Sequence, residues 1–151
     1  MGMDICGWVE VTWRDANDRD WEWAWSGCIR LDPLLNRQDE VGWALFGFSK
    51  VPLEQKHTPI ASRRGLPSNP SDEVRRDMER IIVYENQHGP GDFGNYTWID
   101  FDDVEAIDWE SMGVDDATQS EWREVFEMIR LLRRADRFKG AAFRIVAWTN
   151  W

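Results

Sequence analysis

Residues 4–31 read DICGWVEVTWRDANDRDWEWAWSGCIRL, and this stretch decides the fold. Apolar and polar residues alternate over 4–13 and again over 21–31, as they do in β-strands that bury one side. The polar run at 14–20 is typical of a turn between two such strands. The stretch therefore predicts an antiparallel hairpin.

A turn centred on Asn17 gives every residue of the first strand a partner in the second, and predicts one apolar and one mostly polar face. The apolar face would hold Ile5, Val9, Val11, Trp13, Trp21, Trp23, Trp25 and Ile29, and the polar face Asp4, Cys6, Trp8, Glu10, Thr12, Glu22, Ala24, Ser26, Cys28 and Arg30. Gly7 would then lie opposite Gly27, and Cys6 opposite Cys28. This register permits a disulfide, but we expect free thiols because a cytoplasm is reducing.

Outside the hairpin, hydrophobic periodicity and capping residues predict helices at 39–46, 70–85, 101–107 and 117–138, and strands at 96–99 and 142–148. Residues 43–48 fit a strand as well as a helix. Asn69 is the expected N-cap of the second helix, whose buried residues would be Val74, Met78, Ile81 and Ile82. Asp100 is the expected cap of the third helix. The strand at 142–148 should join the hairpin, which gives an α+β fold with an antiparallel sheet packed against three or four helices.

The length of 151 residues fits a single domain over 1–151. No apolar run reaches the roughly 18 residues of a membrane span, and the first residues lack the pattern of a signal peptide. We therefore expect a cytoplasmic protein with no membrane partner. The net charge of −10 disfavours direct binding of nucleic acid, because an acidic surface repels phosphates.

Charge is unevenly distributed along the chain. Residues 92–121 contain ten carboxylates and no Lys or Arg, whereas 123–151 is rich in Arg. The simplest interpretation is that these helix faces pair with each other or with water. The alternative is that the acidic run, above all Asp100, Asp102, Asp103 and Glu105, presents a surface to a basic protein partner.

Known catalytic and metal-binding motifs are missing from the sequence. It has no nucleophile elbow, P-loop or zinc-binding HExxH. Residues 100–111 begin like a calcium loop, but Glu105 and Ser111 occupy the positions that need Gly and a bidentate Glu. We therefore expect no cofactor and no metal, and favour a binding protein over an enzyme.

The segment Arg63-Arg64-Gly65-Leu66-Pro67 leads into the helix that we expect from Pro70. Two guanidinium groups beside free backbone N–H groups at a helix start would form a phosphate site. Alternatively, both arginines pair with the acidic run at 100–116.

A second candidate group follows in the sequence. His88 lies in an expected Gly-rich loop, and Tyr96 and Trp98 lie on the expected strand at 96–99. Eleven tryptophans is a high number for this length, and most of them should serve the core or a subunit interface. Tyr96 and Trp98, together with His88, could frame a pocket in which a base stacks on an aromatic ring. The alternative for His88 is an exposed loop residue.

Six short segments occur in order along the chain: GWVE at 7–10, LFGF at 45–48, PIA at 59–61, RGLP at 64–67, SDEV at 71–74 and TWI at 97–99. In this pattern the chain resembles small bacteriophage-encoded proteins of unassigned function. The resemblance implies an accessory protein that blunts host defence in the host cytoplasm, either by sequestering a nucleotide signal or by occupying the surface of a defence protein.

Three function classes follow. The first is a non-catalytic homo-oligomeric protein that sequesters a small phosphorylated nucleotide, with Arg63 and Arg64 on the phosphate and Tyr96 or Trp98 on the base. The second is an inhibitor that presents the acidic surface to a host protein. The third is a hydrolase of the same nucleotide, in which carboxylates and His88 assemble in space.

Overall fold

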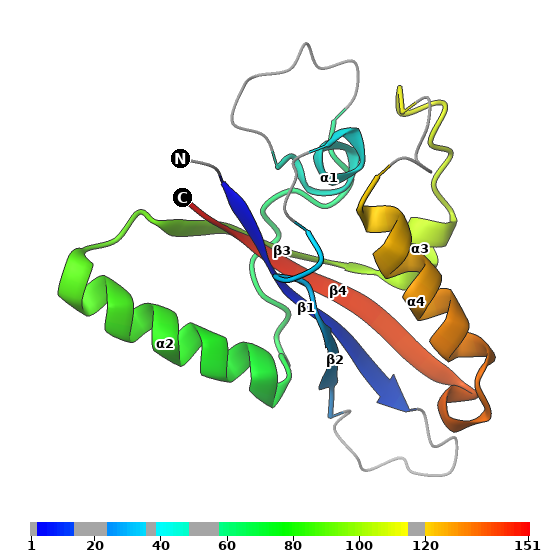
Figure 1. The fold of residues 1–151 in the computed structure, drawn as a ribbon, viewed down its shortest axis with the longest axis horizontal. Helices are drawn as coiled ribbons and strands as arrows, with labels where there is room; N and C mark the ends of the chain where they lie inside the picture. Colours follow the sequence, from blue (N-terminus) through cyan, green and yellow to red (C-terminus); the bar gives the residue numbers. More distant parts are fainter. Residues whose placement is uncertain (1–2, 14–23, 36–38, 49–57, 115–119) are drawn as a thin grey trace.

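The computed structural model describes residues 3–13, 24–35, 39–48, 58–114 and 120–151. Their centre is a four-stranded antiparallel sheet in the order β2-β1-β4-β3 (Figure 1). The strands are β1 (Asp4–Trp13), β2 (Ser26–Arg30), β3 (Phe93–Asp100) and β4 (Ala141–Asn150). The helices are α1 (Glu40–Phe46), α2 (Asp72–His88), α3 (Phe101–Glu105) and α4 (Trp122–Arg134), followed by a 3₁₀ turn, η2 (Asp136–Phe138). The predicted α+β class is confirmed.

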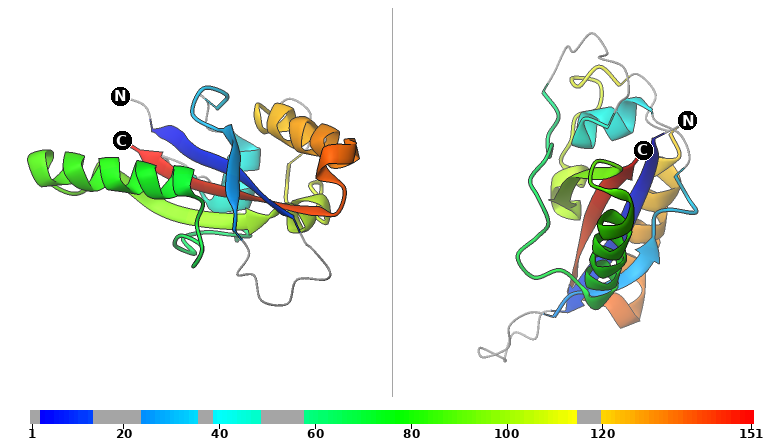
Figure 2. Two further views of the ribbon diagram at one scale, coloured as in Figure 1. Left: turned by 90° about the horizontal axis from the view of Figure 1, so that it is seen from below. Right: turned by 90° about the vertical axis from the view of Figure 1, so that its left-hand side faces the viewer.

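Both faces of the sheet are covered, by different helices (Figures 1 and 2). On one face, α1, α3 and α4 pack on the larger apolar cluster, which includes Val9, Ile145 and Trp122. On the other face, α2 packs on a smaller cluster of Val74, Ile81, Val146 and Trp148. Because β1 and β4 each contribute alternate residues to both clusters, they form the buried centre of the sheet.

The two-sided burial overturns part of the hairpin prediction. The face of Glu10 and Thr12 was expected to be the polar one, yet these residues are only 0% and 4% exposed. Trp25 was expected on the Val9 face, but its ring lies under the guanidinium of Arg144, on the α2 face. Trp21, Trp23 and the expected turn at 14–20 lie outside the described residues.

The predicted register of the hairpin is also wrong. Val9 pairs with Ile29 and Trp8 with Arg30, whereas Glu10 pairs with Gly27, so Cys28 is the extra residue of a β-bulge. Cys6 is therefore not opposite Cys28, and both are free thiols, as expected. Burial raises the pKa of each thiol to about 12, with Asp32 adding to the effect at Cys6 and Glu10 at Cys28.

The helix predicted at 70–85 is α2, with different ends. Ser71, rather than Asn69, is its N-cap, and the Ser71 side chain accepts a hydrogen bond from the amide of Val74. The helix continues to His88, and its C-terminal part projects beyond the strands (Figure 1). Ile82, which was predicted to be buried, is 57% exposed, because it lies off the face of α2 on which Val74, Asp77 and Ile81 are buried.

The other predicted elements are found with shifted ends. The helix at 39–46 is confirmed as α1, capped by Asp39, which excludes the strand alternative. The strands at 96–99 and 142–148 are confirmed as the longer β3 and β4. Helix α3 starts after Asp100, as predicted. Helix α4 ends at Arg134, four residues before the predicted end at 138, because Ala135 is extended.

Candidate ligand-binding surface

A loop segment runs along the outer edge of β3 and holds the arginines singled out from the sequence. The hydroxyl of Thr97 donates a hydrogen bond to the carbonyl oxygen of Ala61. The amide of Gly65 donates to the carbonyl of Tyr96 over 2.9 Å. These bonds satisfy part of an edge that would otherwise be open, and they fix residues 61–65 against the strand.

Arg64 fastens this loop from the side. Its Nη1 donates to the carbonyl of Trp98 over 3.3 Å, and its Nη2 donates to the carbonyl of Ile60 over 3.2 Å. The guanidinium carbon lies 5.6 Å from the centre of the Trp98 ring, within range of a cation–π contact. Arg64 therefore positions the loop and brings positive charge to the Trp98 ring.

Arg63 differs from Arg64 in its backbone and in the use of its donors. It has a φ of 51°, in the left-handed region that costs a non-glycine residue roughly 1–2 kcal/mol. Its Nε donates to Oδ1 of Asn95 over 3.2 Å, and Asn95 is also left-handed, with a φ of 56°. Within the described part of the chain, the other two guanidinium nitrogens of Arg63 make no hydrogen bond or ion pair.

Two aromatic residues, Tyr96 and Trp98, belong to the strand that this loop contacts. Tyr96 and Trp98 are half-buried at the margin of the smaller apolar cluster, and the Tyr96 ring is 6.1 Å from that of Trp148. Burial raises the pKa of the Tyr96 hydroxyl. The structure thus brings together four of the five predicted ligand-binding residues: Arg63, Arg64, Tyr96 and Trp98.

His88, the fifth, lies apart from this group. It is the last residue of α2 rather than part of a loop, and it is exposed. Its ring centre is 4.5 Å from that of Tyr84, whose hydroxyl donates to Asp92 over 2.7 Å. Among the residues that the structure describes, His88 has no ring contact or hydrogen bond with the four grouped residues.

The start of α2 is occupied by a side chain of the protein itself. The amide of Ser71 donates to Oε2 of Glu10 over 2.6 Å, so this carboxylate takes a place that an anion could take at a helix N-terminus. Arg63 and Arg64 bond to β3 and to Ile60 instead.

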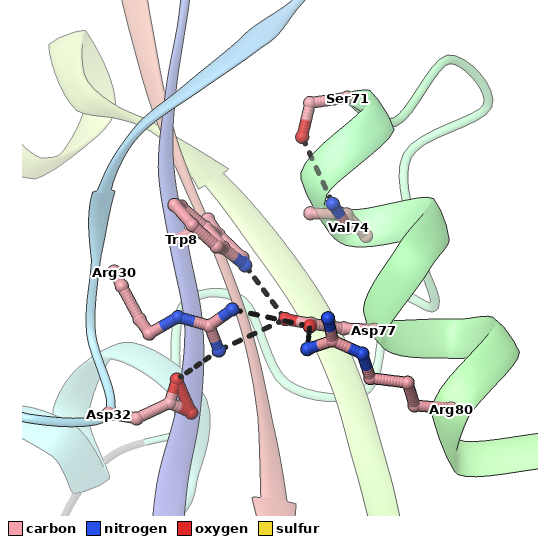
Figure 3. Close-up of polar contacts among 7 residues, drawn as sticks. All are labelled: Trp8, Arg30, Asp32, Ser71, Val74, Asp77 and Arg80. Atoms are coloured by element: carbon pink, nitrogen blue, oxygen red, sulfur yellow. Dashed lines mark hydrogen bonds and ion pairs between the residues drawn. The ribbon is translucent and has the colours of Figure 1, made fainter.

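The sequence did not reveal two polar groups on the α2 side of the sheet, each centred on a buried carboxylate, Asp77 or Glu10. In the first, Asp77 accepts a hydrogen bond from Nε1 of Trp8 over 2.8 Å and pairs with Arg30 over 3.4 Å (Figure 3). Arg30 also pairs with Asp32, and Arg80 approaches Asp77 to 3.7 Å (Figure 3). The position of Asp77, one turn after Val74 on the same helix face, was the available signal.

The second group connects Glu10, on β1, with Arg144, on β4. Nε of Arg144 donates to Oε1 of Glu10 over 2.6 Å, and its terminal nitrogens donate to the side chain and the carbonyl of Asn69. The guanidinium carbon lies 3.8 Å from the centre of the Trp25 ring. Burial lowers the pKa of Arg144, while Glu10 opposes this effect. Each of the three guanidinium nitrogens makes a hydrogen bond within the protein, which indicates a structural role.

The proposed acidic partner surface is partly neutralised within the molecule. Arg133 pairs with Asp102 over 2.5 Å, and Arg130 donates to both carboxylate oxygens of Glu105. Both arginines come from α4, as expected if the acidic run and the basic C-terminal part pair with each other. Asp100 and Asp103 make no ion pair with the residues that the structure describes.

The described residues show neither a metal-ligating cluster nor a membrane-spanning helix. They contain no group of three His, Cys, Asp or Glu residues placed to hold a metal ion. No helix among them has the length and apolar composition needed to cross a membrane. No protein family, curated protein or solved structure matches this chain.

Proposed function

We propose that this protein binds and sequesters a small phosphorylated nucleotide at β3, without catalysing its conversion. Arg63 binds the phosphate, and the exposed parts of Tyr96 and Trp98 contact the base. The observation that carries the proposal is the hydrogen bond from Arg63 to Asn95, because both residues have left-handed backbones and Asn95 directly precedes Tyr96 in β3. Backbone strain of this kind is often kept where a side chain serves a ligand.

The chemistry of the group fits this ligand class. A guanidinium with unused donors can form charge-assisted hydrogen bonds to phosphate oxygens. Half-exposed aromatic rings provide a flat apolar surface for a nucleobase. The resemblance to small phage proteins supports a role in the host cytoplasm, where sequestration would remove a defence signal.

Arg63 provides the direct test, because its contacts in the described structure are few. We expect Arg63→Ala to weaken nucleotide binding about 10–100-fold in titration calorimetry, the usual effect of losing a hydrogen bond to a charged group. The melting temperature should change little, since Arg63 is exposed. Arg63→Gly should weaken binding equally while making the fold more stable than Arg63→Ala does, because glycine accepts the left-handed backbone.

The matched control is Arg134→Ala, which removes the same charge from the exposed end of α4. This variant should bind like the wild type. Native mass spectrometry of the purified protein would report a co-purified ligand and the number of subunits, for which we expect a homo-oligomer. If cyclic and linear nucleotides all fail to bind the wild type, the proposal is wrong, and a protein partner for the acidic surface becomes the next hypothesis to test.

A further inference from the structure

Asp100 is the last residue of β3 and lies next to the group described above. Side chains alternate along a strand, so Tyr96, Trp98 and Asp100 share the face that α2 covers in part. Asp100 is paired in register with Arg144, whose side chain lies on that same face. The face therefore carries two aromatic rings followed by a carboxylate.

The carboxylate of Asp100 does not perform the task expected at its position. Asp100 is the N-cap of α3, where an aspartate normally accepts a hydrogen bond from the first turn, but its side chain makes no such bond. It also lacks a hydrogen-bond or ion-pair partner elsewhere in the described residues. An exposed carboxylate at the end of an aromatic strip thus keeps its acceptors available.

The electrostatic surroundings of Asp100 are mixed. Burial of part of the group raises its pKa, as do Asp103 and Asp102, whereas Arg144 and Arg64 oppose this shift. A hydrogen-bond donor from a ligand would relieve the cost of an ionised carboxylate in this environment. Two adjacent N–H donors would use both of its oxygens.

We propose that Asp100 selects a guanine base, with Trp98 contacting the ring and Asp100 accepting from N1–H and the exocyclic amino group. This inference rests on the proposed function. Adenine presents an unprotonated N1 at the same edge, which a carboxylate repels. Asn95, which accepts from Arg63, lies in the irregular part of β3 between Gly94 and Thr97, three residues before Trp98. Arg64 brings positive charge to within 5.6 Å of the centre of the Trp98 ring, and the phosphate would extend from the base along the same loop to Arg63.

The test compares guanosine, inosine, adenosine and xanthosine 5′-diphosphates by titration calorimetry at pH 7.5. For the wild type, we expect guanosine to bind about tenfold more tightly than inosine, which lacks the amino group, and about 100-fold more tightly than adenosine. Asp100→Asn should reverse the preference between guanosine and xanthosine, because an amide can accept from N1–H and donate to the carbonyl at C2. Asp103→Asn, which removes the same charge from the next helix, should retain the preference for guanosine.

The results separate the two proposals. If Asp100→Asn binds xanthosine diphosphate more tightly relative to guanosine diphosphate, a direct contact of residue 100 with the base is supported. An aspartate with only a structural role would not change the ratio of these two affinities. If the diphosphates bind in an Arg63-dependent way but Asp100→Asn leaves the guanosine-to-xanthosine ratio unchanged, the guanine assignment is wrong and the proposed function stands. If the wild type binds none of the four diphosphates, the guanine assignment is wrong. The proposed function is then tested by the binding of the cyclic and linear nucleotides named above.

Discussion

Arg144 and Glu10 form an ion pair inside the molecule, with 2.6 Å between Nε and Oε1 and side chains that are 5% and 0% exposed. The pair joins the two central strands, and through Asn69 and Ser71 it also holds the loop that leads into α2. A buried pair contributes little net stability by itself, but removal of one partner leaves the other charge without compensation.

We therefore expect Glu10→Gln to lower the free energy of unfolding by about 3–5 kcal/mol, measured by urea denaturation. Glu105→Gln, which breaks the exposed pair with Arg130, should cost about 1 kcal/mol or less. If Glu10→Gln and Glu105→Gln lower the free energy of unfolding equally, the pair of Glu10 and Arg144 is accessible to water.

Gly7 lies at a close approach of β1 to β4. It has a φ of 142°, and an added Cβ would lie 2.9 Å from Cα of Ala147 and overlap the carbonyl oxygen of Val146. Gly7→Ala should therefore cost about 3 kcal/mol, because the backbone of the central strands must move. Gly94→Ala is the control in the neighbouring strand β3, where nothing lies within 4 Å of the new Cβ, and its melting temperature should match or exceed that of the wild type.

Asp100 should cost the fold some stability at neutral pH. Its pKa is raised above the usual 3.8, chiefly by burial, so the folded state favours the protonated form. The contribution of Asp100 to the free energy of unfolding is therefore fully present below pH 3.8. It is lost as the pH rises through the pKa of Asp100 in the folded state. Asp100→Asn should thus raise the melting temperature at pH 7 and leave it unchanged near pH 3. A lower melting temperature at pH 7 would contradict the direction of this pKa shift.

The two cysteines should react slowly in the folded protein. Because burial raises both pKa values to about 12, little thiolate exists at pH 8. Alkylation by iodoacetamide, followed by mass spectrometry, should be on the order of 100-fold slower in the native protein than in urea. A native rate close to that in urea would mean that Cys6 and Cys28 are accessible and ionised.

Elements with strong periodicity could be predicted from the sequence. Alternation identified β1 and β4, and the spacing of Trp122, Val125, Phe126 and Ile129 identified α4, because each of these elements presents apolar residues to the larger cluster. The register of β2 could not be predicted. The bulge at Cys28 shifts it, and a face that buries Glu10 looks polar in the sequence.

Other features could not be predicted because they depend on contacts between residues that are far apart in the sequence. Asn69 was a reasonable helix cap, but Arg144, which is 75 residues away, binds it instead. The grouping of Arg63 and Arg64 with Tyr96 and Trp98 depends on a loop that runs along β3, and no local pattern encodes that path. The sequence could suggest which residue types form the candidate site, but it could not show that His88 lies apart from the other four residues.

The central place of β4 has a consequence for biosynthesis. A chain leaves the ribosome from its N-terminal side, so β1 can pair with β2 early but meets β4 only after more than a hundred further residues, as the 134-residue separation of Glu10 and Arg144 illustrates. A high contact order of this kind slows folding, and it leaves one edge of β1 without its backbone partner during that interval. A nascent chain in this state would be prone to edge-to-edge association, and a chaperone that shields β1 would raise the yield of native protein.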